Sequence, residues 1–96
     1  MTLIDYVKLR HITKIQELIA QGVDLNVQDE YGYTALMWAV NHSKLDIVKL
    51  LLDAGADKTI IDNDKHDCLF WANYYGQKQI IKLFSKEPAI KEKKGK

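Results

Sequence analysis

The sequence has 96 residues, of which 47% are hydrophobic and 28% charged, so it has room for one small domain with a modest core and not for two. Fourteen basic and thirteen acidic side chains leave a formal charge of +1, which disfavours binding to nucleic acid or to an anionic membrane. The single cysteine, Cys68, excludes an intrachain disulfide, and no apolar stretch has the length of a signal-peptide core or a spanning helix. We therefore expect a cytoplasmic protein that does not enter a membrane.

Two short amphipathic helices are predicted at the amino-terminal end of the chain. Their apolar residues recur at helical spacing, which places them on one face of each helix. Gly22 then ends the second helix. Because no finger-like connector precedes the first helix, we expect this pair to be the terminal unit of a stack. The residues of the two faces are Leu3, Ile4, Tyr6 and Val7, and then Ile12, Ile15, Leu18 and Ile19.

The connector at residues 23–33 is predicted to fold back on itself as a hairpin, which we call the first finger. Val23, Leu25 and Val27 alternate as in a strand, and Gly32 has the backbone freedom that a tight turn requires. Thr34 follows at a position from which its hydroxyl can cap the next helix.

A second helix pair follows, and then a second finger. The later helix of this pair is predicted at 45–53, with a broad apolar face and charged residues opposite. In the next connector Lys65 stands where the first finger has Gly32, and Asp67 takes the capping position of Thr34. A side chain in a left-handed turn costs about 1 kcal/mol. We therefore expect the second finger to be looser than the first or differently shaped.

A third helix pair is predicted to close the domain. Its last helix carries Ile80, Ile81, Leu83 and Phe84 opposite polar residues, and a polar outer side keeps a terminal repeat from binding further copies. Pro88 prevents the helix from continuing, and the lysine-rich residues 89–96 have the composition of a disordered tail.

The three units repeat with a period of 33 residues, which includes turn residues as well as apolar ones. A helix pair of this size cannot bury its apolar face alone, so the units are expected to stack on one another. The matching positions are Leu3, Leu36 and Leu69, and the pairs Gly22 and Gly55, Asp29 and Asp62, Trp38 and Trp71, Ala39 and Ala72, and Ile47 and Ile80.

The central unit resembles an ankyrin repeat. It reads Asp29-x-x-Gly32-x-Thr34-Ala35-Leu36-Met37-x-Ala39, then Leu45-x-Ile47-Val48-x-Leu50-Leu51, then Gly55-Ala56-Asp57, and the family pattern is D-x-x-G-x-T-P-L-H-x-A, a helix of I-V-x-x-L-L type, and G-A-D. The resemblance implies an all-α solenoid of stacked antiparallel helix pairs joined by short β-hairpin fingers. It implies one domain over 1–88, with an N-cap repeat at about 1–28, a central repeat at 29–61 and a C-cap repeat at 62–88. Because Ala35 and Met37 replace the family's proline and histidine, we expect the same fold with lower stability.

Several residues that could carry chemistry are interpreted as structural. Trp38 and Trp71 are predicted to pack between repeats, since each precedes an alanine at which helices approach closely, and Met37 and Phe70 are assigned to the core in the same way. His42 is interpreted as a partly exposed surface residue rather than a pH switch.

No metal, cofactor or catalytic site is predicted. The donors of the second finger alternate along a hairpin and are not expected to converge on an ion, so they are interpreted as a solvated turn. The sequence has no nucleophile elbow, no phosphate-binding glycine loop and no H-E-x-x-H motif, and we do not expect an enzyme. The donors considered are Asp62, Asp64, His66, Asp67 and Cys68.

By resemblance, the partner-binding residues are expected at the finger tips and at the exposed ends of the first helix in each pair. Tyrosine is favoured at such places because it gives a large contact area at low entropic cost, although each ring could instead pack along a neighbouring repeat. The expected residues are Glu30, Tyr31 and Tyr33 on the first finger, Asn41 and His42 on the central helix, Asn63, Asp64 and His66 on the second finger, and Tyr74 and Tyr75 on the last unit.

Three functions are compatible with this reading. The first is a monomeric, non-enzymatic protein-protein interaction module that binds one folded protein partner. The second is a bacterial immunity or inhibitor protein that neutralises a toxin or an enzyme. The third is a structural component that associates with itself, and the polar faces predicted for both end repeats weigh against it.

Overall fold

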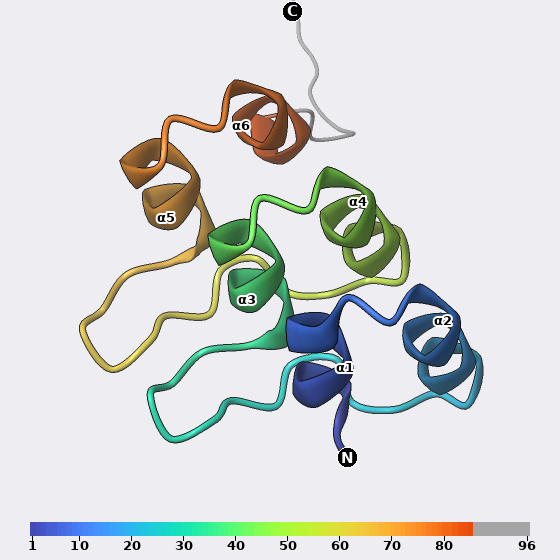
Figure 1. The fold of residues 1–96 in the computed structure, drawn as a ribbon. Helices are drawn as coiled ribbons and strands as arrows, with labels where there is room; N and C mark the ends of the chain where they lie inside the picture. Colours follow the sequence, from blue (N-terminus) through green and yellow to red (C-terminus); the bar gives the residue numbers. More distant parts are fainter. Residues whose placement is uncertain (86–96) are drawn as a thin grey trace, which may run out of the picture.

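The computed structural model describes residues 1–85, which form three antiparallel helix pairs stacked in sequence order (Figure 1). The first helices of the pairs lie side by side in one row, and the second helices form another row beside it, on the side away from the two long connectors. The helices are α1 (Leu3–Leu9), α2 (Ile12–Ala20), α3 (Ala35–Asn41), α4 (Leu45–Asp53), α5 (Cys68–Tyr74) and α6 (Lys78–Ser85). The predicted all-α architecture of stacked antiparallel helix pairs is confirmed for the described residues. The predicted stop at Pro88, the end of the third repeat and the tail at 89–96 lie outside the described residues.

Side chains cap the first helix of each pair. Thr2 and Asp5 form a reciprocal capping box on α1, in which the Asp5 carboxylate accepts from the Thr2 N–H at 2.8 Å. On α3 the Thr34 hydroxyl accepts from the Met37 N–H at 3.3 Å, as predicted. The predicted cap of α5 is also present, since the Asp67 carboxylate accepts from the Phe70 N–H at 2.8 Å. These caps fix where each helix begins and so set the register of the stack.

The core lies between the two rows of helices, and the central pair contributes most to it. Ala39 and Ala72 are fully buried, which allows the first helices to approach closely. Cys68 is buried as well, and burial raises the pKa of its thiol to about 12, so it remains protonated at neutral pH. The fully buried large side chains are Val7, Ile15, Leu36, Met37, Val40, Ile47, Val48 and Leu51.

The two fingers project from the row of first helices and have the same backbone shape (Figure 1). Within residues 1–85 they contain no regular strand, and each is closed by a tight turn. In the first turn Gly32 donates to the Asp29 carbonyl at 2.9 Å, and in the second Lys65 donates to the Asp62 carbonyl at the same distance. The φ angles of Gly32 and Lys65 are 80° and 67°. The expectation of a differently shaped second finger is therefore wrong, because Lys65 adopts the left-handed conformation.

The last repeat is less polar on its outer side than the sequence predicted. Leu69 and Phe70 are 41% and 39% exposed, whereas Leu36 and Met37, at the matching positions of the central repeat, are 1% and 0% exposed. The assignment of Met37 to the core is confirmed, and that of Phe70 is wrong. The reason is that α3 is covered by α5, whereas no helix within residues 1–85 covers α5 in the same way.

Candidate functional site

An aspartate fixes each finger to the helix that follows it. One carboxylate oxygen of Asp29 accepts from the N–H groups of Tyr31 and Tyr33, both at 2.9 Å, and the other accepts from the indole N–H of Trp38 at 2.8 Å. Two of these hydrogen bonds stabilise the turn of the first finger, and the third fixes the finger to α3.

The second finger repeats this arrangement. Asp62 accepts from the N–H groups of Asp64 and His66 at 2.9 Å and from the indole of Trp71 at 3.0 Å. Sequence reasoning missed these pairs and assigned both tryptophans to packing alone. A signal was present, since an aspartate precedes each tryptophan by nine residues in two successive repeats.

The two fingers are also joined to each other. The Asn63 backbone N–H donates to the Tyr31 carbonyl at 3.1 Å, and its side-chain amide donates to the Glu30 carbonyl at 2.9 Å. The amide of Gln28 donates to the carbonyls of Gly32 and Ile61, both at 2.9 Å. Asn63, which was expected to contact a partner, therefore has a structural role in holding the fingers together.

Aromatic side chains form a continuous surface, which we call the aromatic strip, over the fingers and the first helices. Tyr33 lies between two indoles, with its ring centroid 5.2 Å from that of Trp38 and 6.0 Å from that of Trp71. Tyr31 contacts Tyr33 at 5.9 Å, and His42 stacks on Trp38 at 5.9 Å. The strip consists of Tyr31, Tyr33, Trp38, His42, His66, Phe70, Trp71, Tyr74 and Tyr75.

The strip is widest on the third repeat. Tyr74 and Tyr75 contact Trp71 at centroid distances of 5.6 and 6.1 Å and are 68% and 48% exposed. Phe70 stacks on His66 at 3.7 Å with the rings nearly parallel. Exposed apolar and aromatic side chains that touch one another in this way form a surface suited to contact with another molecule.

The residues expected from the sequence lie along this strip but differ in exposure. Tyr33 is half-buried between the tryptophans, and Asn41 and His66 are also partly buried. Phe70 is exposed although the sequence assigned it to the core, whereas Trp38 and Trp71 are partly buried and pack against the core, as predicted. The expected residues with exposed side chains are Glu30, Tyr31, His42, Asn63, Asp64, Tyr74 and Tyr75.

Acidic side chains accompany the aromatic ones. The finger turns and the start of α5 carry five carboxylates, from Asp29, Glu30, Asp62, Asp64 and Asp67, and one lysine, Lys65. The effect is visible at Tyr33, whose pKa is raised first by burial and then by the negative charges of Asp62 and Asp64. The phenol of Tyr33 thus stays protonated in an environment of negative potential.

The donors of the second finger converge more than the sequence suggested. Asp62, Asp64 and His66 each offer a ligand atom within 4.8 Å of the others, so the prediction that they stay apart is wrong for these three. The Asp62 carboxylate, however, is buried and already accepts three N–H hydrogen bonds, while Asp67 caps α5 and Cys68 lies in the core. The geometry is that of a hydrogen-bonded turn.

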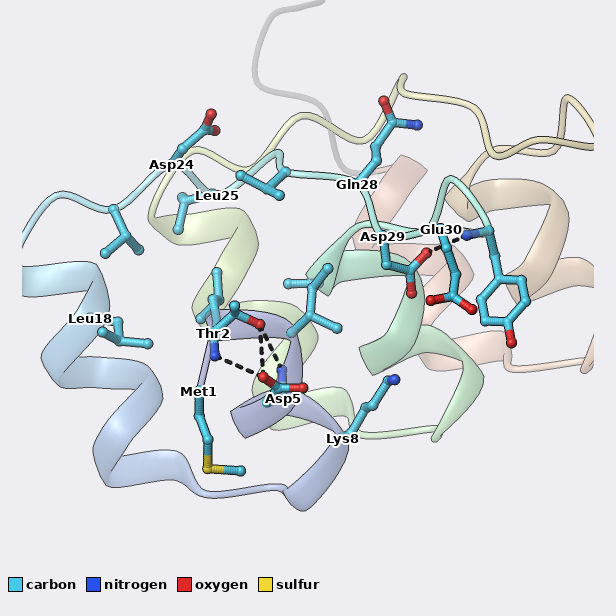
Figure 2. Close-up of a pocket in the computed structure, with 16 residues that line it drawn as sticks. Met1, Thr2, Asp5, Lys8, Leu18, Asp24, Leu25, Gln28, Asp29 and Glu30 are labelled. Carbon is cyan, nitrogen blue, oxygen red and sulfur yellow. Dashed lines mark hydrogen bonds between the residues drawn. The ribbon is translucent and has the colours of Figure 1, made fainter.

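A groove of about 680 Å³ lies at the amino-terminal end of the stack, between α1, the end of α2 and the first finger (Figure 2). Apolar residues such as Leu18 and Leu25 line it together with Asp5, Asp24 and Lys8. Asp5 is engaged in capping α1, as the dashed lines in Figure 2 show. Glu30 and Tyr31 belong to both the groove and the finger, so the groove extends the surface of the strip toward the first repeat.

None of the helices within residues 1–85 is both long enough and apolar enough to cross a lipid bilayer.

Comparisons with known proteins identify relatives of this architecture. The family model described as "Ankyrin repeats (3 copies)" matches residues 3–94. The "Ankyrin repeat, SAM and basic leucine zipper domain-containing protein 1" of Ovis aries is 43% identical over 43 residues, which cover 45% of this chain and 9% of that protein. The "Ankyrin repeat domain-containing protein SAT10" of Stachybotrys chartarum is 45% identical over 38 residues, which cover 40% of this chain and 2% of that protein.

A solved structure extends the likeness to almost all of the described fold. The structure titled "Crystal Structure of EF0377 an Ankyrin Repeat Protein" has a TM-score of 0.83 and 35% sequence identity, and the match covers 90% of this chain and 46% of that one. The chain thus spans less than half the length of each of these relatives.

Proposed function

Because the chain belongs to the ankyrin repeat family, whose repeats are generally protein-protein interaction modules, we propose that it is a non-enzymatic module that binds a folded protein partner. The binding surface in this proposal is the aromatic strip, with the finger tips at one side and the exposed ends of α3 and α5 at the other. We also propose that the chain acts as a monomer in the cytoplasm, where a protein whose single cysteine forms no intrachain disulfide is commonly found.

The observation that carries this proposal is the exposure of Tyr31, Tyr74 and Tyr75 within a connected set of rings. A solvated surface is normally made of lysine and glutamate, whereas tyrosine and tryptophan are enriched where binding energy is concentrated. The hydrogen bonds that Asp29 and Asp62 accept from the indoles hold Trp38 and Trp71 in place before a partner arrives, which lowers the entropic cost of binding.

A capture experiment tests the proposal. The tagged wild-type chain and a variant with Tyr31→Ala, Tyr74→Ala and Tyr75→Ala are used to retain proteins from a lysate of the source cells. These three side chains are exposed, so the variant should keep its fold, which circular dichroism checks. A matched control carries Gln16→Ala, Lys49→Ala and Lys82→Ala, which alters exposed residues of the second helices instead.

We expect the wild type and the control to retain a protein that the tyrosine variant loses. If the tyrosine variant retains the same protein as the wild type while the control loses it, the binding surface lies on the second helices and the proposal is wrong.

A further inference from the structure

The surroundings of Trp38 and Trp71 can be compared directly, because the two residues occupy the same position in successive repeats. Each indole N–H donates to an aspartate of its finger. Each ring is stacked by the aromatic side chain four residues later, with His42 on Trp38 at 24° and Tyr75 on Trp71 at 25° between the ring planes. Each indole also meets the edge of the ring five residues earlier: Tyr33 lies 5.2 Å from Trp38, and His66 lies 5.5 Å from Trp71. Three contacts around Trp38 therefore have counterparts around Trp71.

One contact is not repeated. The ammonium group of Lys8 lies 4.4 Å from the centroid of the Trp38 ring, which is a cation–π contact. The residue 33 positions after Lys8 is Asn41, which has no charge. Within residues 1–85, Trp38 has a cation over its ring and Trp71 has none.

The position of Asn41 is also unusual in its hydrogen bonding. Its side-chain oxygen is buried and has no hydrogen-bond partner in the described part of the chain. The same position of the repeat is therefore Lys8, with an ammonium group, in the first repeat and Asn41, with an unpartnered oxygen, in the second.

The charge near Trp71 favours a cation. Asp62 accepts from its indole N–H, Asp64 lies near His66, whose ring stacks on Phe70, and Asp67 caps the helix that carries Trp71. Three carboxylates therefore lie on the second finger and at the start of α5, next to the aromatic rings of this repeat. Aromatic faces attract cations through their quadrupole, and nearby carboxylates add a charge attraction of the same sign. Lys65 at the finger tip is the one lysine or arginine between Asp62 and Tyr75.

We propose, as an inference that rests on the proposed function, that the protein partner places a cationic side chain, lysine or arginine, on the aromatic rings around Trp71. The first repeat supplies its own cation through Lys8, and the third repeat takes the corresponding cation from the partner. The partner therefore presents a basic contact surface to the second finger and α5.

The test uses a blocked peptide of alternating glycine and arginine, and a control peptide in which citrulline, a neutral group of nearly the same shape, replaces each arginine. The readout is the NMR signal of each tryptophan indole N–H, assigned with a Trp71→Phe variant. We expect the arginine peptide to shift the Trp71 signal in a saturable way and to leave the Trp38 signal almost unchanged. We expect the citrulline peptide to bind roughly two- to five-fold more weakly for each arginine engaged.

A Lys8→Ala variant tests whether the ammonium group of Lys8 is the reason that Trp38 and Trp71 respond differently. Removing the ammonium group should make the Trp38 signal respond to the arginine peptide as the Trp71 signal does. Lys8 is exposed, so the variant should remain folded. Equal shifts with arginine and citrulline, or equal response of both tryptophans in the wild type, would overturn the inference.

Failure of this inference and failure of the proposed function give different results. If a partner is captured through the strip but the arginine and citrulline peptides bind equally, the binding function stands and the cation preference is wrong. If the peptide result is as expected but capture does not depend on the exposed tyrosines, the proposed function is wrong, and the inference about the partner falls with it.

Discussion

The central and third repeats have the same backbone conformation but bury their matching side chains to different extents. Leu36 and Leu69 occupy one position in the pattern, yet the first is 1% exposed and the second 41%. Gly32 and Lys65 occupy another, and both have positive φ angles. The difference comes from the neighbour, since the central repeat is covered on both sides and the third repeat on one side only within the described residues. The sequence pattern determines the backbone of each repeat, and the neighbouring repeat determines which of its side chains are buried.

The largest effect is expected from truncating the matched leucines. Leu36→Ala should lower the free energy of unfolding by about 2–5 kcal/mol because it leaves a cavity between repeats. Leu69→Ala should lower it by less than about 1 kcal/mol, because much of that side chain is already in water. Urea denaturation followed by circular dichroism measures both. Equal losses would show that the third repeat is covered as fully as the central one.

The next effect concerns the turn of the first finger. A Cβ atom on Gly32 would lie 2.6 Å from the backbone nitrogen of Asn63, on the second finger. Gly32→Ala should therefore lower the free energy of unfolding by about 2–4 kcal/mol, from the contact and the positive φ together. Lys65→Ala, at the same position of the second finger, is the matched control and should be nearly neutral in the same denaturation experiment. A mild effect at Gly32 would mean that the two fingers separate easily.

A smaller effect of opposite sign is expected at the second turn. Lys65→Gly removes the cost of a side chain at positive φ but increases the freedom of the unfolded chain, so stability should rise by about 0.5 kcal/mol. The measurement is the midpoint of thermal unfolding. A lower midpoint would indicate that the lysine side chain itself contributes to stability at the finger tip.

The smallest effect at neutral pH is expected at Cys68, which matches Ala35 of the central repeat. Its thiol pKa is raised from 9.0 in the unfolded chain to about 12 by burial, so the folded state holds the proton more tightly. This contribution to stability is complete below pH 9 and is lost as the pH rises from about 9 toward 12. Cys68→Ala should change stability little at pH 7 and should reduce the loss of stability between pH 9 and 11. If stability falls equally with pH in the wild type and the Cys68→Ala variant, the raised pKa of Cys68 does not cause the loss.

The sequence predicts the fold well because the signals for it are local or periodic. The 33-residue period, the caps at Thr34 and Asp67, and the alanines at close approach all follow from residue types and spacing. The comparisons and the six helices confirm the architecture.

The candidate site is predicted less completely because it depends on contacts between segments. That Asp29 reaches the indole of Trp38, nine residues away, follows from how the finger lies on the helix and not from spacing alone. That Phe70 is exposed while Met37 is buried depends on which helix lies beyond each repeat. Sequence reasoning therefore names most residues of the strip but not the tryptophans that organise it.

The turn at Lys65 also affects whether a third finger could stack on the second one. The first finger accepts a neighbour because Gly32 leaves room for the backbone of Asn63 at a point where a Cβ atom would collide. A further finger laid on the second in the same register would meet the Cβ of Lys65 at that point, whether it came from the same chain or from another molecule. Lys65 therefore disfavours the stacking of another finger on the second one in this register, and Lys65→Gly would remove the collision.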